Sequence, residues 1–377
     1  MPMPARATPL AVLLTERIRQ HGPITFADYM EACLYHPQYG YYSKHDQEPR
    51  RDYFTSVDVS PLFGRLLARQ FEEMWAELDR PNTFLLVEAG AGNGVLAKDI
   101  LDFLAQSSPE FYSAIRCVAV ERSEARRRAL DKTLESHISR EGCASSAEMP
   151  EKIPCGCIFS NELLNAMPVH RAIQQGLELR EIYVAAEGNQ LREILDPVST
   201  PRIGEYFAEQ GIALCDGQQA EAGLAACDWI ESAGKRLHRG FVVTIDYGRE
   251  ARELYDERHM RGTLLAYERH RASEEFYRAP GDQDLTAHAN FTALDLWGGR
   301  GGLVRTGLTT QTNFLLALAR ASNLADVDTP GAAEKDKGRA RLLFKTLINP
   351  EGMGETFQAL VQHKGIASPR LSGLQPL

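Results

Sequence analysis

The residues that most clearly suggest chemistry form a glycine-rich turn at 86–96. The sequence there is LVEAGAGNGVL, in which three glycines alternate with other residues and an acid stands two places before the first glycine. Glycine lets the backbone come close to a ligand, and a helix that begins after such a turn points its N-terminal amides at the ligand. The turn therefore predicts a cofactor site, whose candidate residues are Glu88, Gly90, Ala91, Gly92, Asn93 and Gly94.

The spacing of the glycines narrows the kind of cofactor. A dinucleotide fingerprint of the form GxGxxG would require a small residue at Val95, but the third glycine stands one position earlier, at Gly94. Glu121 ends the next predicted strand, at about the distance where an acid meets ribose hydroxyls in this architecture. Together these features favour a nucleoside without a pyrophosphate. A packing turn beside an exposed glutamate, or an NAD-dependent dehydrogenase, is the alternative interpretation.

The pattern from residue 83 onward predicts the sheet that must hold these residues. Short β-rich runs alternate with helical ones, in the order FLLV, VLAKDILDFLA, IRCVAV, a charged helix at about 123–137, and CIFS. This alternation is typical of parallel strands joined by right-handed crossover helices. We therefore predict an α/β fold with a doubly wound, Rossmann-like sheet, at whose carboxyl-terminal edge Glu88 and Glu121 converge.

Further elements are predicted before and within this sheet. The first eighty residues look helical, with helix starts at the capping residues Thr8, Thr25 and Ser60. The runs at 168–195 are separated by Gln-Gly and Gly-Asn turns, which are typical of hairpin strands. The alternation then resumes with a helix from about 219 to 237 that leads into the strand FVVTI.

The last part of the chain is predicted to complete the sheet. Strands are expected at 302–307 and 356–362, separated by helices that include 310–321. The segment WGGRGG at 297–302 is interpreted as a flexible turn before a strand. The run Arg126-Arg127-Arg128 is interpreted as the exposed face of a helix, because no aromatic residues interleave it.

Composition excludes several classes of protein. The 377 residues are 44% hydrophobic and 25% charged, which describes a globular chain, and no apolar run is long enough to span a bilayer. The 42 basic and 51 acidic residues give a net charge of −9, so nucleic acid is not an expected partner. The first residues show no cleavage site or transit pattern, so a cytoplasmic location is expected.

The cysteines and the common catalytic motifs point away from metal and hydrolase chemistry. Seven scattered cysteines suit reduced thiols in a core, and Cys155 with Cys157 is the one close pair, so no metal site is predicted. The sequence also has no GxSxG elbow, P-loop lysine or HExxH pair, which argues against the commonest hydrolases, NTPases and metalloproteases.

Several separated motifs, taken in order, resemble one family. Besides the glycine turn they are DYFTS at 52–56, SNELLNAMP at 160–168, DYG at 246–248, RGTL at 261–264, DLTAH at 284–288 and GMGE at 352–355. This series is similar to the MidA-like family of class I S-adenosylmethionine-dependent methyltransferases, and it covers nearly the whole chain from Ile24 onward. The sequence departs from the family at Asn165, where an aspartate is usual, and at Val57-Asp58, where Pro-Glu is usual.

The resemblance implies a fold, a cofactor and an acceptor. The fold would be a Rossmann-like class I methyltransferase sheet over 81–377, with insertions at about 168–235 and 250–300, and a helical segment at 1–80 packing on it. The cofactor would be S-adenosyl-L-methionine. The family's mitochondrial member is an arginine methyltransferase that assists respiratory complex I assembly. A protein arginine is thus the implied acceptor, with a respiratory-complex subunit as the candidate substrate, and the oligomeric state stays open.

The acceptor chemistry directs attention to acids near the sheet edge. A carboxylate can orient a planar guanidinium and make one of its nitrogens a better nucleophile, while the donor mainly needs to be held in line. Glu162 is the leading catalytic candidate, and Asn161 is expected to contact the donor or support the loop. Thr55 and Ser56 are candidates for binding the donor's carboxylate if the loop that carries them closes.

Two weaker catalytic candidates lie further along the chain. Asp246 follows the strand FVVTI and is predicted to lie near the same sheet edge, and Asp284 with His288, in DLTAH, is predicted to line the acceptor side. The alternatives are a turn acid for Asp246 and a hydrogen-bonded structural role for His288. At the level of function, a small-molecule methyltransferase and a non-catalytic assembly chaperone that binds the same cofactor remain alternatives to a protein-arginine methyltransferase.

Overall fold

The computed structural model describes residues 7–44, 60–269, 271–323, 334–349 and 356–376. The chain divides into two compact units, and each has its own hydrophobic core. Unit 1 comprises Met1–Tyr53, Leu164–Trp229 and Gly248–Leu294, and unit 2 comprises Phe54–Leu163, Ile230–Tyr247 and Asp295–Leu377. The predicted helical segment at 1–80 is thus shared between the two units.

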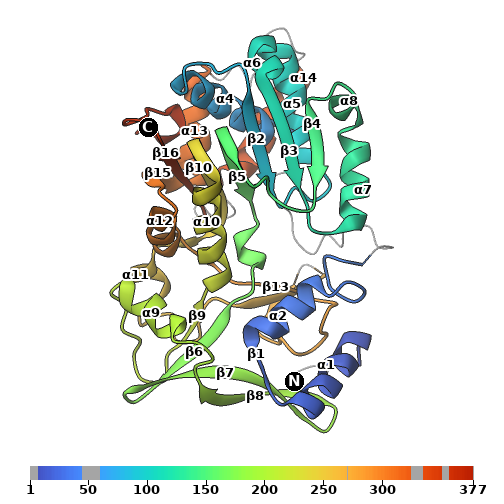
Figure 1. Cartoon of the computed structure of the whole chain (residues 1–377), viewed down its shortest axis with the longest axis vertical. Coiled ribbons are helices and arrows are strands. Elements are labelled where there is room, and N and C mark those ends of the chain that lie inside the picture. Colours follow the sequence, from blue (N-terminus) through green and yellow to red (C-terminus); the bar gives the residue numbers. More distant parts are fainter. Residues whose placement is uncertain (1–6, 45–59, 270, 324–333, 350–355, 377) are drawn as a thin grey trace. The chain divides into compact units, whose positions relative to one another are not determined.

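Unit 2 is built on a mostly parallel sheet with the strand order β15-β16-β10-β5-β2-β3-β4 (Figure 1). Its strands are β2 (Phe84–Ala89), β3 (Ile115–Val120), β4 (Cys143–Ser146), β5 (Ile153–Asn161), β10 (Leu237–Arg249), β15 (Val304–Thr310) and β16 (Phe357–Lys364). Neighbours from β4 to β10 are parallel, while β16 is antiparallel to both β10 and β15. The predicted α/β class and the Rossmann-like sheet are confirmed.

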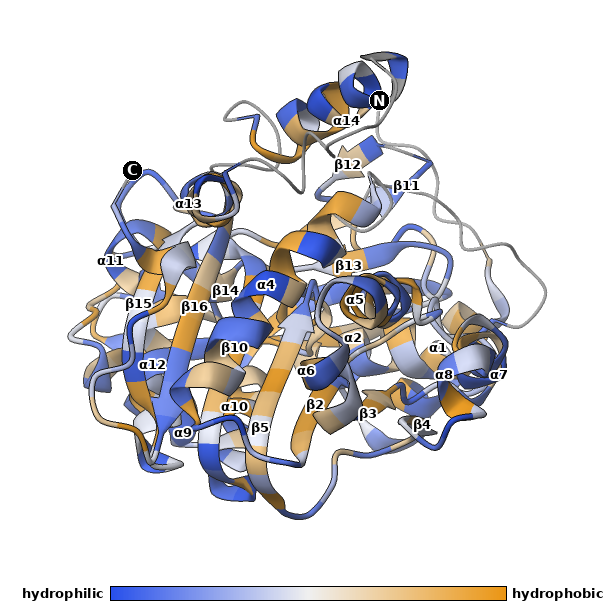
Figure 2. Cartoon of the chain, turned by 90° about the horizontal axis from the view of Figure 1, so that it is seen from above, coloured by the Kyte–Doolittle hydropathy of each residue, from blue (hydrophilic) through white to orange (hydrophobic). Residues whose placement is uncertain are grey.

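Helices cover this sheet. They are α4 (Pro61–Glu77), α5 (Val95–Ser107), α6 (Pro109–Ala114), α7 (Glu124–Thr133), α8 (Glu135–Ile138), α13 (Gln311–Ala321) and α14 (Glu334–Leu347), with the short η3 (Ser372–Leu374) near the end. Two further helices, α10 (Leu224–Arg236) and α12 (Phe291–Arg300), begin in unit 1 and end in unit 2. In Figure 2 much of β2 and β5 is coloured as hydrophobic, as expected for strands covered on both faces.

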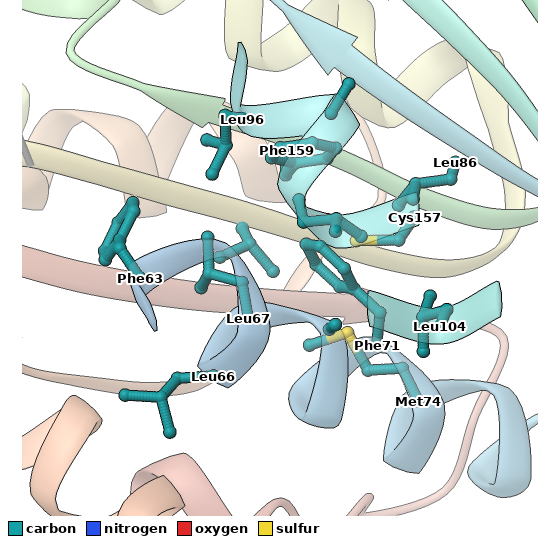
Figure 3. Packing of buried hydrophobic residues seen from close by; sticks show 14 of the residues in the cluster. Phe63, Leu66, Leu67, Phe71, Met74, Leu86, Leu96, Leu104, Cys157 and Phe159 are labelled. Carbon is teal, nitrogen blue, oxygen red and sulfur yellow. The ribbon is translucent and has the colours of Figure 1, made fainter. Parts of the chain in front are cut away.

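The core of unit 2 forms where α4 meets the sheet. Apolar side chains of α4 recur at helical spacing and pack against residues of α5 and β5 (Figure 3). The rings of Phe71 and Phe159 lie 4.9 Å apart, and both side chains are buried. Burying a side chain of this size contributes about 1.5–3 kcal/mol, so this packing holds the α4 face of the sheet firmly. A Cβ at Gly64 would lie 2.7 Å from Asp99 Cβ, so glycine is needed for the close approach of α4 to α5.

Unit 1 contains two antiparallel sheets. A five-stranded sheet has the order β1-β7-β6-β9, with β8 paired to β7, and a three-stranded sheet has the order β12-β11-β13. The strands are β1 (Ile24–Thr25), β6 (His170–Gln175), β7 (Glu178–Glu187), β8 (Gln190–Pro197), β9 (Gln219–Ala222), β11 (Leu265–Glu268), β12 (Arg271–Ser273) and β13 (Asp284–Thr286), and β14 (Ala289–Asn290) pairs with the end of β10. The predicted hairpins at 168–195 are confirmed as β6, β7 and β8.

Two helices of unit 1 begin at predicted capping residues. The helices of this unit are α1 (Pro9–His21), α2 (Phe26–Tyr35), η1 (Leu164–Ala166), α9 (Arg202–Glu209) and α11 (Ala251–Leu254). Thr8 Oγ1 accepts a hydrogen bond from the Ala11 amide at 3.1 Å, and Thr25 Oγ1 accepts one from the Asp28 amide at the same distance. In unit 2, Ser60 Oγ accepts from the Leu62 amide at 3.2 Å, so all three predicted helix starts are confirmed.

Two local predictions were wrong. Residues 219–222 are not the start of a helix but strand β9, because their backbone pairs with β6 and α10 begins only at Leu224. The segment at 297–302 is not a turn throughout, because α12 continues to Arg300. Trp297 is buried there, and a Cβ at Gly298 would lie 2.5 Å from Gln362 Nε2. Tertiary packing therefore overrides the low helix propensity of the glycines.

The sequence predicted reduced cysteines and no membrane-spanning segment. All seven cysteines are free thiols, and five of them are buried. Across the part of the chain that the structure describes, no helix combines the length and the apolar character needed to cross a bilayer.

Candidate functional site

The register of the parallel strands brings most of the predicted site residues to one edge of unit 2. Ala89 at the end of β2 lies opposite Val120 of β3 and opposite Ser160 of β5. On the other side of β5, Asn161 lies opposite Ile245 of β10. The residues that follow these strand ends therefore lie at the same edge. In a doubly wound sheet this is the edge where ligands bind.

The glycine turn after β2 has left-handed backbone at each of its three glycines. The φ angles are 75° at Gly90, 56° at Gly92 and 79° at Gly94. A Cβ at Gly90 would lie 2.8 Å from Leu163 Cδ1, and one at Gly94 would lie 3.0 Å from Leu130 Cγ, so a side chain at either position would also crowd a leucine. At Gly92 a Cβ would meet no atom of the described chain within 4 Å. Gly92 thus borders open space.

The turn is tied to β3 and to Glu121. The amides of Gly90 and Ala91 both donate to the carbonyl oxygen of Val120 at 2.9 Å. Glu121 is buried, and its carboxylate accepts hydrogen bonds from the amide of Gly92 at 3.1 Å and from the amide of Ser123 at 2.8 Å. The two loops that follow β2 and β3 are therefore joined through one acidic side chain.

Glu88 is a buried acid without a cationic partner among the described residues. It is 4% exposed, and burial raises its pKa to about 8, although a hydrogen bond from the backbone of Ala97 acts in the opposite direction. Its Oε2 atom has no hydrogen-bond partner in the described chain. Since a buried polar atom without a partner costs free energy, this atom is of the kind that a bound ligand satisfies.

The end of β5 carries two more polar atoms of this kind. Neither Ser160 Oγ nor Asn161 Oδ1 has a hydrogen-bond partner within the described ranges, and both atoms are buried. The other amide atom of Asn161, Nδ2, donates to Glu162 Oε1 at 3.2 Å. The sequence predicted Asn161 as a site residue but not Ser160. In the sequence Ser160 is simply a small residue near the end of a strand, and no local pattern distinguishes it.

Glu162 follows β5 in an unusual backbone conformation. Its φ angle is 54°, in the left-handed region that residues with a side chain rarely adopt. Its amide donates to the carbonyl oxygen of Ile245 at 2.9 Å, and the next residue, Leu163, contacts the turn at Gly90. Asp246 follows Ile245, is fully buried, and accepts a hydrogen bond from the amide of Tyr247 at 2.9 Å. Glu162 and Asp246 thus both lie at the edge that carries the glycine turn.

His288 and Asp284 belong to unit 1. The His288 amide donates to Thr263 Oγ1 at 3.0 Å, and the side chain lines a pocket together with Glu221, Tyr255 and others. Burial lowers the pKa of His288 to about 4, so the imidazole is neutral at pH 7. Both carboxylate oxygens of Asp284 accept from the hydroxyl of Tyr42 at 2.9 Å.

Two predicted site residues lie outside the described ranges, and Arg127 makes contacts that the sequence did not predict. Thr55 and Ser56 lie outside the described residues, as does the GMGE motif at 352–355. Arg127 is only half-exposed, and its Nη1 donates to the carbonyl oxygens of Glu121 and Arg122. Arg128 is exposed and Arg126 and Arg127 are partly exposed, as expected for an outer helix face, but the contacts of Arg127 with these two carbonyl oxygens were not predicted. The sequence signal for these contacts is the position of Arg127 in the first turn of the helix that follows Glu121, from where its side chain can reach back to the end of the strand.

Comparisons with known proteins agree on one family. A family profile described as "Putative S-adenosyl-L-methionine-dependent methyltransferase" matches residues 66–309. The chain is 27% identical to "Protein arginine methyltransferase NDUFAF7, mitochondrial" of Rattus norvegicus, over 95% of this chain and 85% of that protein. The Homo sapiens protein of the same name is also 27% identical, over 96% of this chain and 86% of its own length.

A solved structure extends the similarity to the fold of the whole chain. A Burkholderia thailandensis protein, determined with S-adenosyl-homocysteine bound, is 29% identical and superposes with a TM-score of 0.85 over 99% of this chain and 97% of that one. The family profile covers well over half of the 377 residues. The chain therefore belongs to the MidA-like family of S-adenosyl-L-methionine-dependent methyltransferases.

Proposed function

We propose that this protein transfers the methyl group of S-adenosylmethionine to a guanidinium nitrogen of an arginine in a protein substrate. Family membership supports the donor, and the names of the mammalian relatives support the acceptor. The observation that carries the proposal is the position of Glu162. This acid is held in left-handed backbone at the strand edge, between Asn161 and a leucine that contacts the glycine turn. Strain of this kind is concentrated at functional sites.

The residues around the glycine turn fit the donor. Glu121 has the acidic side chain that two adjacent ribose hydroxyls require, and the open space beside Gly92 leaves room for a ligand close to the backbone. The buried carboxyl of Glu88 has an unsatisfied oxygen, which suits the ammonium group of the donor. Ser160 and Asn161 offer two further unsatisfied polar atoms. When bound, S-adenosylmethionine supplies an electrophilic methyl group on a sulfonium sulfur.

The acid at the strand edge would act on the acceptor. A carboxylate that accepts hydrogen bonds from two guanidinium nitrogens fixes the plane of the group and concentrates its positive charge near the acid, which leaves the third nitrogen more nucleophilic. Glu162 is proposed for this role, and Asn161 holds one of its oxygens through a hydrogen bond of 3.2 Å. After transfer the methylated guanidinium must lose a proton, and the Glu162 carboxylate is proposed to accept it. Asp246, fully buried after the adjacent strand, is proposed to support acceptor binding, while the role of His288 stays a prediction from the sequence.

Methyl transfer from labelled donor tests the proposal. The purified chain is incubated with isotopically labelled S-adenosylmethionine and a cell extract that includes respiratory-complex subunits, and labelled proteins are digested and analysed by mass spectrometry. The expected product is methylarginine. Label on another residue type would overturn the arginine assignment, and label confined to small molecules would support the small-molecule alternative. Donor binding without any incorporation would support the assembly chaperone.

Variants of two acids separate chemistry from binding. Glu162→Gln keeps the size of the side chain but removes its charge, so methyl transfer should fall by roughly 100-fold or more while donor affinity changes little. Glu151→Gln removes a charge from an exposed position of the same unit and should leave both quantities unchanged. Full turnover by Glu162→Gln would remove this acid from the mechanism.

A further inference from the structure

Arg127 turns back from helix α7 to the end of strand β3. Its Nη1 atom donates to the carbonyl oxygen of Glu121 at 2.6 Å and to that of Arg122 at 2.8 Å. Both carbonyls follow the last residue of β3, where the chain reverses into α7, whose N-cap is Ser123. A single guanidinium nitrogen therefore holds two successive peptide groups of the loop that carries the predicted ribose-binding acid.

Every polar group of Glu121 is held in place. Its amide donates to the carbonyl oxygen of Ser146 at 2.9 Å, and its carbonyl oxygen accepts from Arg127. Its Oε1 accepts from the amide of Ser123 and its Oε2 from the amide of Gly92. Three of these four partners are backbone groups, which substitutions other than proline leave in place. The fourth is the side chain of Arg127, so the anchoring of Glu121 can be tested there.

We propose that Arg127 is a positioning residue for the ribose of the methyl donor. This inference rests on the proposed donor site, in which Glu121 binds the two ribose hydroxyls. By clamping the carbonyls at 121 and 122, Arg127 keeps the Glu121 carboxylate in its binding position before the donor arrives. A preorganised acid loses little conformational freedom on binding, and the donor therefore binds more tightly.

Two neighbouring arginines provide a matched pair of variants. Arg127→Met removes both hydrogen bonds but keeps the length of the side chain. Arg128→Met removes the same charge from an exposed arginine whose partner is Glu124 in the same helix, so it serves as the control. Calorimetric titration with S-adenosylhomocysteine should show affinity about tenfold lower for Arg127→Met, the effect of losing a hydrogen bond from a charged group, and unchanged affinity for Arg128→Met.

A second ligand distinguishes positioning from general loosening. The 2′-deoxy analogue of S-adenosylhomocysteine lacks one of the hydroxyls that Glu121 would bind. The unmodified protein should bind this analogue more weakly than it binds S-adenosylhomocysteine. Arg127→Met should lower the affinity for the analogue by a much smaller factor than it lowers the affinity for S-adenosylhomocysteine. An equal loss for both ligands would overturn the inference, because it would mean that Arg127 only stabilises the fold. Arg127→Lys keeps one cationic hydrogen-bond donor, so its affinity for S-adenosylhomocysteine should lie between those of the unmodified protein and Arg127→Met. If Arg127→Met does not fold, the lysine variant still tests the inference.

The variant Glu121→Gln separates failure of this inference from failure of the donor site itself. If Glu121→Gln leaves the affinity for S-adenosylhomocysteine unchanged, the proposed ribose contact is wrong and the inference falls with it. If Glu121→Gln weakens binding but Arg127→Met and Arg127→Lys do not, only the inference about Arg127 is overturned. In the expected case, adding Arg127→Met to Glu121→Gln causes little further loss, because both changes act on the same contact.

Discussion

The amide of Glu162 donates a hydrogen bond to the carbonyl oxygen of Ile245 across 2.9 Å. This bond links the residue that follows β5 to the neighbouring strand β10, and it holds Glu162 at a φ angle of 54°. For a residue with a Cβ such backbone costs roughly 1–2 kcal/mol. The sheet thus sustains a strained conformation at the residue that we propose to act on the acceptor.

Replacing Glu162 should separate stability from activity. Glu162→Gly should raise the free energy of unfolding by up to about 1 kcal/mol, because glycine adopts left-handed backbone without a steric penalty, while methyl transfer is lost with the carboxylate. Glu162→Ala should lose the same activity without the gain in stability. Chemical denaturation and a labelled-donor assay measure the two quantities. A glycine variant less stable than the alanine variant would show that the backbone is not strained there.

The pKa of Glu88 predicts that donor binding depends on pH. Burial raises this pKa to about 8, so at pH 6.5 the carboxyl is mostly protonated and must lose its proton to pair with the donor's ammonium group. Affinity for S-adenosylhomocysteine should therefore rise between pH 6.5 and 8. Calorimetry in buffers of different ionisation enthalpy should detect proton release. Glu88→Gln should bind more weakly with little pH dependence, whereas Glu110→Gln, at an exposed position, should behave like the unmodified protein.

The same raised pKa affects stability in a defined direction. Between the ordinary glutamate pKa of 4.5 and the folded value of about 8, the folded state holds more protons on Glu88 than the unfolded state does. The free energy of unfolding without ligand should therefore fall as pH rises through this window. Glu88→Gln should remove that component of the slope in chemical denaturation at a series of pH values. An unchanged slope would mean that Glu88 ionises normally in the folded protein.

Two glycines of the turn should respond differently to alanine. At Gly92 a Cβ would meet no described atom within 4 Å, so Gly92→Ala should cost only the roughly 1–2 kcal/mol of left-handed backbone but should reduce donor affinity, because the Cβ enters the open space. At Gly94 the Cβ would also press against Leu130, so Gly94→Ala should destabilise the protein more. Thermal unfolding and donor titration measure both effects. Normal donor affinity for Gly92→Ala would place the donor away from this turn.

His288 should make the protein sensitive to acid. Its folded pKa of about 4 lies below the ordinary histidine value of 6.5, so between these values the unfolded state binds more protons and stability falls as pH is lowered. His288→Gln should lose less stability than the unmodified protein between pH 6.5 and 4. A second variant, His288→Asn, removes the same titrating group and should give the same shallower slope. A slope in either variant as steep as that of the unmodified protein would contradict the lowered pKa of His288.

The sequence by itself determined the features whose chemistry is local. Capping side chains at Thr8, Thr25 and Ser60 predicted three helix starts, because a cap is satisfied by an amide only two or three residues away. The alternating glycines of the turn predicted backbone that residues with a side chain rarely adopt, and the alternation of strands and helices predicted the parallel sheet. The same alternation predicted that Glu121 and Glu162 stand at strand ends, and each does directly follow a strand.

Only the tertiary structure decided what depends on pairing between distant segments. Residues 219–222 became strand β9 because β6 was available to pair with them, and Arg127 contacts the carbonyl oxygens of Glu121 and Arg122 because the chain reverses sharply after Glu121. The grouping of residues 1–53 with 164–229 and 248–294 in one unit is likewise absent from any local pattern. Such contacts follow from strand register and from close packing, and these exist only once segments far apart in the chain have come together.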